Sequence, residues 1–465
     1  MNFVSIQFAA FFVAVLVVYW SLPRRAQHVL LLLASYLFYA AWDWRFLSLI
    51  VVSTLVDFLS GSRIHNASSA KRKRLWLGLS LLVNLGILGY FKYANFFLES
   101  LQALAFSAGW HLSVPTLQII LPVGISFYTF QTLSYSLDIY LGRLTPSRSI
   151  IEFGAFVAFF PQLVAGPIVR AREFLFQLEE RRRFDPAQFE RGAIRFLTGF
   201  FKKAVIADNL AIMVVDPVFA APGDYGTGTL WLAAVAYSVQ IYADFSGYSS
   251  MAIGCAAMLG FDLPENFRFP YLARDFSDFW RRWHMTMSRF FRDYVYIPLG
   301  GSHGSAWRTR SNLAATTVVS GLWHGASWTF VVWGGLHGVF IMVTHVLRSD
   351  GRSRGLLGGG IGWMLTFMGV LFAWILFRSP TFGDAAVFLD GLWGREGTVI
   401  APTPLILVLL AAAVVDHLAG LALERAPDLS ARIPPPLKAA WCVGLIVFAY
   451  HAMPRAANPF IYFQF

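Results

Sequence analysis

The chain has 465 residues, of which 57% are hydrophobic and only 14% charged, and its mean hydropathy is +0.57. Soluble proteins carry about a quarter charged residues, so this composition excludes a string of ordinary soluble domains. The net charge of +11 would suggest nucleic acid in a soluble chain. Here the basic residues cluster in short loops between apolar runs, which is typical of the positive-inside bias and of contact with anionic lipid. We therefore expect the lipid bilayer, and no nucleic acid, as a partner.

Apolar runs of about 20 residues recur along the whole chain, and each is long enough to cross a bilayer core as a helix. The runs cover residues 3–22, 28–42, 46–61, 75–98, 117–142, 204–220, 231–261, 361–377, 405–423 and 439–453. Stretch 312–347 is long enough for two crossings or a hairpin, so the pattern predicts about eleven crossings in all. Arg24 and Arg25 follow the first run, which we interpret as a retained span with its N-terminus outside.

Four other segments depart from the simple pattern of spans. Residues 99–116 contain no Lys or Arg and are expected to form an outside loop. Residues 150–169 contain two prolines and have basic residues at both ends, which suggests a re-entrant hairpin. Residues 172–192 mix charged and apolar side chains, as in a cytoplasmic surface helix. Residues 262–310 are basic and aromatic, and they are too charged for a conventional span.

These patterns predict one integral membrane domain with three parts. N-terminal helices occupy residues 1–149, a catalytic core with re-entrant segments occupies 150–347, and C-terminal helices occupy 348–465.

His324 lies in GLWHGASW (321–328), within an otherwise apolar stretch. An ionisable side chain at membrane depth is costly, so it is a functional candidate by default. The alternative is a structural histidine bonded to a neighbouring backbone carbonyl. The small residues Gly321, Gly325 and Ala326 favour a functional site, because they let another backbone or a ligand approach the imidazole.

His284 is the second candidate, in the stretch FWRRWHMTMSRFF. An interfacial belt of tryptophans and arginines is one explanation of this stretch. The other is that the segment folds back over a cavity, offering a second imidazole together with cations for phosphate groups. The segments that hold His284 and His324 follow one another in the chain, so we expect them to meet.

The remaining polar residues are not interpreted as catalytic. Four further histidines are taken as structural: His337, His345, His417 and His451. Asp244 and Asp138 are expected to pair with arginines. Ser302 in GGSHG is not interpreted as a nucleophile, because that motif needs a strand–turn–helix setting. Cys255 and Cys442 fit no metal-binding or disulfide pattern, and no metal site is predicted.

Several motifs together resemble the membrane-bound O-acyltransferases, in particular the bacterial branch that acts on alginate and teichoic acid. The motifs are LPVGISFYTFQTLSY (121–135), FFPQLVAGPIVR (159–170), QIYADFSGYSSMAIG (240–254), the stretch 267–301, GLWHGASW with the following GGLHG, and the ending PFIYFQF. They cover nearly the whole chain in the family's order. "DFWRRWH" and "DYVYIPLGG" are closest to the alginate-type members. The chain departs from the subgroup at Ser250, where an acidic residue is common.

The resemblance implies an all-α polytopic fold, a ring of about eleven transmembrane helices with re-entrant segments around a central tunnel. His324 matches the family's invariant histidine and His284 its second one, which makes both catalytic candidates. The donor- and substrate-binding candidates beside them are Trp323, Trp283, Arg281, Arg282, Arg289 and Asp244. The arginines suit the phosphates of coenzyme A, and indole N–H groups suit the oxyanion of an acyl transfer.

The implied function is transfer of an acyl group, expected to be acetyl, from a cytoplasmic thioester to an exported polysaccharide or cell-wall glycan. The donor is acetyl-CoA or a carrier-protein thioester, no cofactor is bound, and a periplasmic esterase-like partner completes the transfer. The location is the bacterial inner membrane. Three alternatives stay open: D-alanyl or other acyl transfer from a carrier protein, a transporter or flippase of an acylated intermediate, and a secretion-complex scaffold.

Overall fold

The computed structural model describes residues 1–113, 115–180, 183–349, 359–426, 433–454 and 460. Within these ranges the chain is helical, and its β structure is limited to one isolated bridge between Tyr225 and Thr398. Five helical stretches in the described part are long and apolar enough to cross a membrane: Arg24–Asn66, Ala70–Ser107, Trp328–Arg348, Gly360–Arg378 and Pro404–Arg425. The prediction of a multi-pass helical membrane protein is confirmed, whereas the count of about eleven crossings stays a prediction.

The chain forms two compact units. The first contains Met1–Ala193 and Ala252–Pro264, and the second contains Ile194–Met251 and Glu265–Phe465. Helices α10 (Pro186–Phe201) and α13 (Thr227–Met258) contribute residues to both. The division into three sequence segments stays a prediction.

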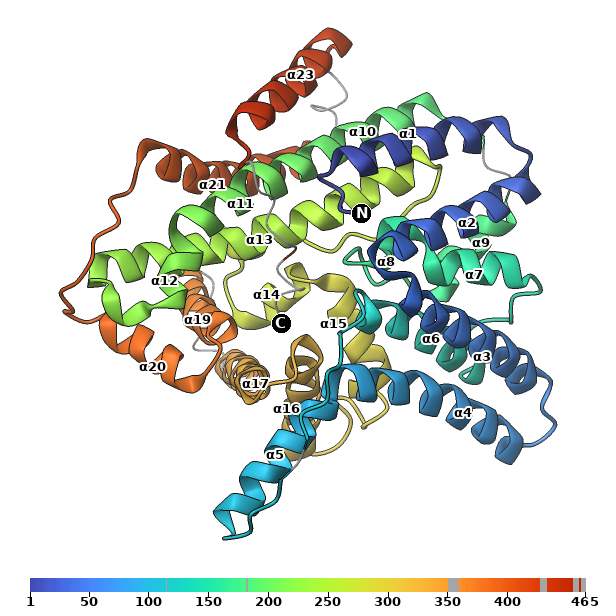
Figure 1. The fold of residues 1–465 in the computed structure, drawn as a ribbon, viewed down its shortest axis with the longest axis horizontal. Helices are drawn as coiled ribbons and strands as arrows, with labels where there is room; N and C mark the ends of the chain where they lie inside the picture. Colours follow the sequence, from blue (N-terminus) through green and yellow to red (C-terminus); the bar gives the residue numbers. More distant parts are fainter. Residues whose placement is uncertain (114, 181–182, 350–358, 427–432, 455–459, 461–465) are drawn as a thin grey trace. The chain divides into compact units, whose positions relative to one another are not determined.

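The first unit contains nine helices before α10 among its described residues: α1 (Ile6–Ser21), α2 (Arg24–Asp43), α3 (Leu47–Asn66), α4 (Ala70–Leu88), α5 (Ala94–Ser107), α6 (Ile125–Tyr140), α7 (Ile150–Ala158), α8 (Phe160–Leu163) and α9 (Ala171–Glu179). Helix α3 packs against both α4 and α6 (Figure 1). The fully buried Asp57 carboxylate of α3 accepts hydrogen bonds from Asn84 Nδ2 of α4 and Ser136 Oγ of α6, each at 2.8 Å. Ser80 Oγ donates to it as well. These bonds satisfy a carboxylate that burial would otherwise destabilise.

The stretch 150–169 is broken, as its prolines predict. Helix α7 ends at Ala158, α8 is a single turn, and the chain is non-helical from there to Arg170. A Cβ on Gly166 would lie 2.5 Å from the Cα of Gln162, so only glycine fits this turn. The side chains from Phe153 to Ala171 are all buried, so protein surrounds the irregular backbone. The re-entrant path through a bilayer stays a prediction.

Two predictions in the first unit are wrong. The segment 172–192 is not one surface helix, because α9 ends at Glu179 and α10 begins at Pro186, and α9 buries Phe174 and Leu178. Phe174 and Leu178 therefore pack within the protein, whereas Phe176 is exposed. The segment 99–116 is not wholly a loop, because α5 continues to Ser107. The absence of basic residues carries no information on where a helix ends, and the outside location of the segment stays a prediction.

The second unit holds the ends of α10 and α13 and ten further helices among its described residues: α11 (Asp208–Leu210), α12 (Asp216–Ala220), α14 (Phe276–Arg282), α15 (Met285–Phe291), α16 (Ala306–His324), α17 (Trp328–Ser349), α19 (Gly360–Arg378), α20 (Phe382–Gly391), α21 (Pro404–Arg425) and α23 (Pro435–Ala452). The long stretch 312–347 is a helical hairpin, α16 followed by α17, whose two arms lie side by side (Figure 1).

Glycines bring the two arms of this hairpin into close contact. A Cβ on Gly321 of α16 would lie 2.2 Å from the carbonyl oxygen of Phe330, and a Cβ on Gly334 of α17 would lie 2.3 Å from that of Thr317. A side chain at either position would force the helices apart. The expectation that small residues permit a close backbone approach around His324 is confirmed.

Candidate active site

His284 lies at the junction of α14 and α15, in a backbone conformation that is rare outside glycine. Its φ angle is 42°, in the left-handed region. The turn is held by Asn266, whose backbone carbonyl accepts a hydrogen bond from Met285 N at 2.9 Å. His284 is 0% exposed. A strained residue that its surroundings hold in place is common at functional sites.

The side chain of Asn266 fixes the protonation of the His284 ring. Asn266 Oδ1 lies 3.1 Å from His284 Nδ1 and also accepts from Thr286 N at 3.3 Å and Thr286 Oγ1 at 2.9 Å. The amide nitrogen of Asn266 donates to Ser249 Oγ at 3.1 Å. Because Asn266 presents its acceptor to the ring, His284 Nδ1 carries the proton and Nε2 is the basic nitrogen. His284 lies outside the five candidate spans, and its burial lowers its pKa to about 3, so the ring is neutral at physiological pH.

His324 is the last residue of α16, and three aromatic rings surround it. The ring centroids of Trp323, Trp333 and Phe377 lie 5.0, 5.1 and 5.5 Å from that of His324. His324 is only 3% exposed. The next residue, Gly325, is in contact with Phe330, and a Cβ there would overlap its ring at 2.1 Å. The imidazole is therefore held among aromatic rings.

The two candidate histidines lie together in the second unit. Their ring centroids are 6.5 Å apart, with an interplanar angle of 57°. Trp323 contacts both rings, at 5.8 Å from His284 and 5.0 Å from His324. The expectation that the two segments meet is therefore correct, although their 40-residue separation alone does not bring them together. Two buried imidazoles this close can hold and pass a proton beside a reacting group.

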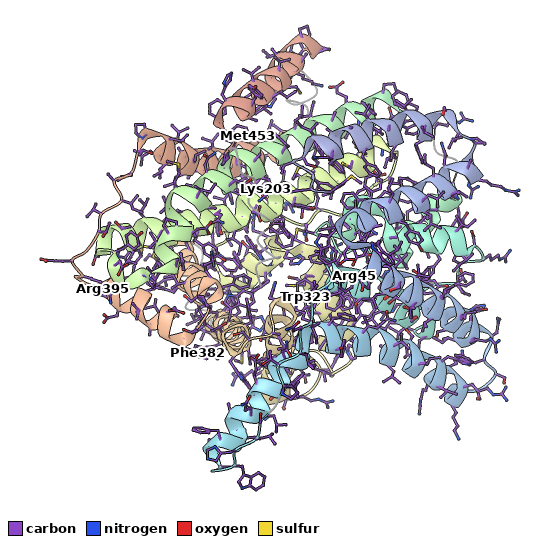
Figure 2. All side chains as sticks on the ribbon, viewed as in Figure 1. Arg45, Lys203, Trp323, Phe382, Arg395 and Met453 are labelled. Atoms are coloured by element: carbon purple, nitrogen blue, oxygen red, sulfur yellow. The ribbon has the colours of Figure 1, made fainter. Side chains whose placement is uncertain are left out.

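The two candidate tryptophans occupy different positions. Trp323, labelled in Figure 2, contacts the rings of both histidines. Trp283 is fully buried, stacks on Phe279 at a centroid distance of 5.7 Å and contacts the tilted ring of Trp374 at 4.9 Å. Trp323 is thus in contact with the imidazoles, whereas Trp283 supports the backbone turn that carries His284.

The candidate arginines lie on the short helices beside this turn. Arg281 and Arg282 both pair with Asp278 of α14, at 3.4 and 3.0 Å. Arg282 also lines a cavity of about 640 Å³ with Arg274 and Arg425. Arg289 lies in the last turn of α15 and is partly exposed. Their role in binding phosphate stays a prediction.

Asp244 belongs to a buried charged cluster, in which it pairs with a lysine. Lys203 Nζ lies 2.7 Å from Asp244 Oδ1 and 2.7 Å from Asp208 Oδ1. All three side chains are at most 4% exposed. The neighbouring residue, Phe245, reaches the His284 ring with a centroid distance of 4.7 Å. In the first unit, Asp138 does face arginines, Arg172 at 3.6 Å and Arg143 at 4.0 Å.

The histidines interpreted as structural have different surroundings. His417 donates from Nδ1 to the carbonyl of Ala413 at 2.9 Å, as a structural histidine would. His451 lies near the end of α23 and contacts Tyr450 edge to face. His337 and His345 line a cavity beside the hairpin, and the loop residue Ser302 lines it too. The PFIYFQF ending lies outside the described residues except for Phe460, whose ring contacts Phe245 at 5.6 Å.

Asn266 is the site residue that the sequence reasoning missed. It lies in DLPENFRF, between charged residues, where an asparagine looks like part of a solvated loop. Its role depends on a contact with a residue 18 positions later. The one local signal was its place directly before the aromatic stretch FRFPY, where a buried polar side chain would need a partner.

Comparison with known proteins identifies the family of the chain. Residues 143–352, which include both histidines, match the model of the MBOAT, membrane-bound O-acyltransferase, family. The chain is 43% identical over 384 residues to the probable alginate O-acetylase AlgI of Azotobacter vinelandii, covering 81% of this chain and 75% of that protein.

Two other relatives are annotated with related activities. The chain is 36% identical to a peptidoglycan O-acetyltransferase of Helicobacter pylori, covering 79% of this chain and 74% of the relative. It is 28% identical to a teichoic acid D-alanyltransferase of Streptococcus thermophilus, covering 58% and 69%. The chain therefore belongs to the membrane-bound O-acyltransferase family, and it is an acyltransferase of the membrane.

Proposed function

We propose that this protein transfers an acetyl group from a cytoplasmic thioester, across the inner membrane, to a hydroxyl group of an exported polysaccharide or cell-wall glycan. The observation that carries the proposal is the buried pair of His284 and His324, 6.5 Å apart, with Asn266 fixing the tautomer of His284. The relatives that act on alginate and peptidoglycan support a glycan as the acceptor.

His324 is the proposed general base. An acceptor hydroxyl attacks the thioester carbonyl while an imidazole nitrogen of His324 takes the hydroxyl proton. The carbon–sulfur bond then breaks, an ester carbon–oxygen bond has formed, and the proton leaves with the thiolate as a thiol. A positioned base of this kind contributes about 10²–10⁴-fold to the rate. The indole N–H of Trp323 is the proposed donor to the oxyanion. His284, whose Nε2 carries no proton, is proposed to accept and pass a proton beside the reacting group.

We take the aromatic rings around His324 to favour a short acyl group. Three aromatic rings lie within 5.5 Å of the imidazole centroid. A long acyl chain would have to displace Trp333 or Phe377, each 1% exposed. Acetyl fits this environment with the least rearrangement. The donor is acetyl-CoA or an acetyl carrier protein, and no cofactor is required by the chemistry.

The main alternative within the same chemistry is D-alanyl transfer from a carrier protein. The lower identity to the D-alanyltransferase, 28% against 43% to the alginate acetylase, favours acetyl. A periplasmic esterase-like partner fits a system in which the glycan itself stays outside the membrane. A flippase of an acylated intermediate would use the same membrane architecture but would not need an imidazole base.

The deciding experiment measures the ester content of exported glycans in cells with the wild-type protein, with His324→Ala, with His284→Ala, or with no protein. Membrane levels of each variant are measured in parallel. We expect both variants to accumulate and the esters to fall to the level of the strain without the protein. The mass of the ester group identifies the acyl chain.

The result that overturns the proposal is persistence of the esters in both variants at normal membrane levels. In that case neither histidine is a working group, and a transporter that moves an acylated intermediate explains the protein better. A released group with the mass of D-alanine instead of acetate would replace the proposed donor with an aminoacyl thioester.

A further inference from the structure

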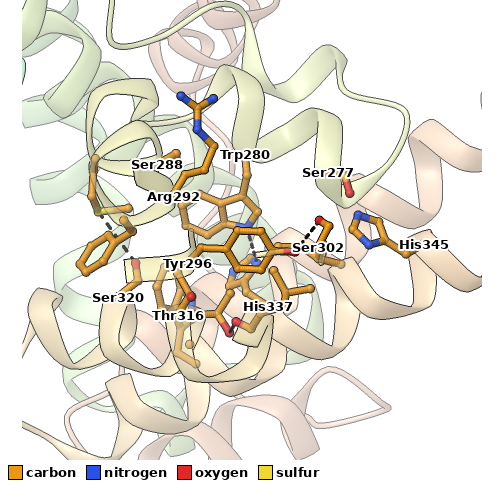
Figure 3. Close-up of a pocket in the computed structure, with 17 residues that line it drawn as sticks. Ser277, Trp280, Ser288, Arg292, Tyr296, Ser302, Thr316, Ser320, His337 and His345 are labelled. Atoms are coloured by element: carbon orange, nitrogen blue, oxygen red, sulfur yellow. Dashed lines mark hydrogen bonds between the residues drawn. The ribbon is translucent and has the colours of Figure 1, made fainter. Parts of the chain in front are cut away.

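A cavity of about 640 Å³ in the second unit lies at the ends of two candidate spans. It is bounded by the short helix α14, the first turn of α19 and the last part of α21. It shares no lining residue with the cavity beside the hairpin, which Figure 3 shows, and neither His284 nor His324 lines it. Because α19 begins and α21 ends at this cavity, it lies at one boundary of the apolar part of both helices.

The lining of the cavity is positively charged. Arg274, Arg282 and Arg425 line it together with one carboxylate, Asp278, so three positive charges and one negative charge give a net charge of +2. Asp278 Oδ2 accepts a hydrogen bond from Arg282 Nε at 3.0 Å, which holds that guanidinium at the cavity. Arg274 and Arg425 are exposed. Because a guanidinium presents a planar fork of N–H donors that matches phosphate oxygens, this lining suits a phosphate group.

The first turn of α19 adds backbone donors to these arginines. Gly359 and Gly360 line the cavity, and within the described residues no side chain caps this end of the helix. A Cβ on Gly360 would meet no atom within 4 Å, so an anion can approach the backbone there. The N–H groups at a helix N-terminus attract anions. The helix end therefore adds to the attraction that the arginines already provide.

An exposed apolar face of α21 leads to the arginines. Leu407, Val414 and Leu418 are 53, 58 and 56% exposed, and their spacing of seven and four residues places them on one face of the helix. Leu418 and Leu421 line the cavity, and Arg425 continues the same face. A soluble phosphate compound would use the arginines but not this face. A phospholipid would use both, because its acyl chains need an apolar surface next to the site that holds its headgroup.

We propose that this cavity binds the phosphate of an anionic phospholipid, whose acyl chains lie along the exposed face of α21. A basic pocket between spans is a common kind of site for lipid headgroups. Trp363 also lines the cavity, is 42% exposed, and donates from its indole nitrogen to the carbonyl of Tyr271 at 2.8 Å. A tryptophan in this position is typical of the membrane interface. Since α14 leads directly into the turn at His284, the bound lipid also stabilises that turn.

The test measures lipid binding to the purified full-length protein in detergent by native mass spectrometry. The probes are phosphatidylglycerol and phosphatidylcholine with the same acyl chains, and glycerol phosphate as a headgroup without chains. Each arginine near a membrane surface is worth about fivefold in affinity for an anionic lipid. We therefore expect Arg274→Gln and Arg425→Gln each to weaken the binding of phosphatidylglycerol about fivefold, and the double variant to weaken it about 25-fold.

Gly360 allows a second test that leaves the arginines in place. Gly360→Glu puts a carboxylate at the cavity, and a negative charge in the first turn is favourable for the helix itself. The fold is therefore kept while the affinity for phosphatidylglycerol falls. Gly360→Gln has the same size without the charge and should weaken binding less. Arg72→Gln alters an exposed arginine in the first turn of α4, away from the cavity, and should leave the affinity unchanged.

Thermal unfolding provides a measurement that does not require activity. Phosphatidylglycerol is expected to raise the unfolding midpoint of the wild-type protein and to have little effect on the double variant. The proposal does not depend on which acyl group is transferred. If the proposed function fails, no ester forms, but phosphatidylglycerol still raises the midpoint.

Equal binding of phosphatidylglycerol to the wild type and to the double variant overturns the proposal. So does equal binding of phosphatidylcholine and phosphatidylglycerol, because charge would then have no part in binding. Coenzyme A is added as a fourth probe, since Arg282 is also a candidate for its phosphates. If glycerol phosphate or coenzyme A binds as tightly as phosphatidylglycerol and with the same dependence on the arginines, the cavity belongs to a soluble phosphate compound and the proposal is wrong. If Arg274→Gln does not accumulate, Arg425→Gln and Gly360→Glu decide the matter.

Discussion

Trp333 contacts His324 edge to face, with ring centroids 5.1 Å apart and an interplanar angle of 86°. The same indole lines the cavity that contains His337, and it is 1% exposed. It therefore separates the space beside the imidazole from the cavity. A group that reacts at His324 must fit against this ring, which gives Trp333 control over the length of the acyl chain.

Trp333→Phe is expected to change the preference from acetyl towards longer acyl chains. A smaller ring leaves room for about one or two methylene groups, and one methylene group in an apolar pocket is worth about 10–200-fold in discrimination. The measurement compares kcat/KM for acetyl and butyryl donors in membranes. The substitution Trp307→Ala, at a tryptophan of α16 that is 76% exposed, serves as the control. An unchanged ratio in Trp333→Phe would show that another residue limits the chain.

Asn266→Ala is expected to lower kcat by about tenfold or more, because His284 loses the hydrogen-bond acceptor that fixes its tautomer. The buried donors that Asn266 now satisfies would also lose their partner, and each unsatisfied donor costs about 1–3 kcal/mol. Asn266→Asp keeps an acceptor beside Nδ1 and should retain more activity than Asn266→Ala. Rates of ester formation at equal membrane levels check this ordering. Asn209→Ala is the control for fold, since that asparagine is similarly buried but bonds only backbone carbonyls. Equal loss in Asn266→Asp and Asn266→Ala would contradict the tautomer argument.

The sequence was sufficient to find the two histidines but not the residues that hold their rings in position. His284 and His324 stand out because an ionisable group in an apolar or aromatic stretch is energetically unusual. Asn266 does not stand out, since its importance arises only when the turn at His284 brings it against the ring. The sequence also did not show that His337 lines a cavity, because no local pattern indicates which rings do so.

Helices were predicted better where they are continuous than where they break. The hairpin of α16 and α17 and the interruption after α7 follow from apolar length and from proline and glycine. The division between α9 and α10 does not, because charged and apolar residues alternate on both sides of it and burial of Phe174 depends on tertiary packing.

The packing of the hairpin predicts that Gly321→Ala destabilises the protein. The new Cβ would lie 2.2 Å from a backbone oxygen, which cannot move aside as a flexible side chain could. Overpacking of this kind costs about 1–3 kcal/mol. Gly335→Ala is the matched control, because a Cβ there would lie 3.9 Å from its nearest neighbour. Thermal unfolding in detergent should show a lower midpoint for Gly321→Ala and little change for Gly335→Ala. Equal midpoints would mean that the hairpin arms can separate without cost.

The charged cluster of Lys203, Asp208 and Asp244 predicts a strong dependence of folding on a single lysine (Figure 2). Lys203→Met removes the cation that holds two buried carboxylates, and breaking such a pair costs about 3–5 kcal/mol. We expect this variant to accumulate poorly in membranes. Adding Asp208→Asn and Asp244→Asn removes the uncompensated charges and should restore much of the protein. Size-exclusion profiles of a fluorescent fusion in detergent measure both effects.

The control for this prediction is Arg268→Ala, which breaks an exposed ion pair with Glu424 and should cost no more than about 1 kcal/mol. Recovery in the triple variant would show that burial of charge, and not the shape of the lysine, makes Lys203 necessary. If the triple variant accumulates but forms no ester, the cluster also has a part in the reaction, which the contact of Phe245 with the His284 ring makes physically reasonable. Normal accumulation of Lys203→Met would instead mean that the two carboxylates share a proton and need no cation.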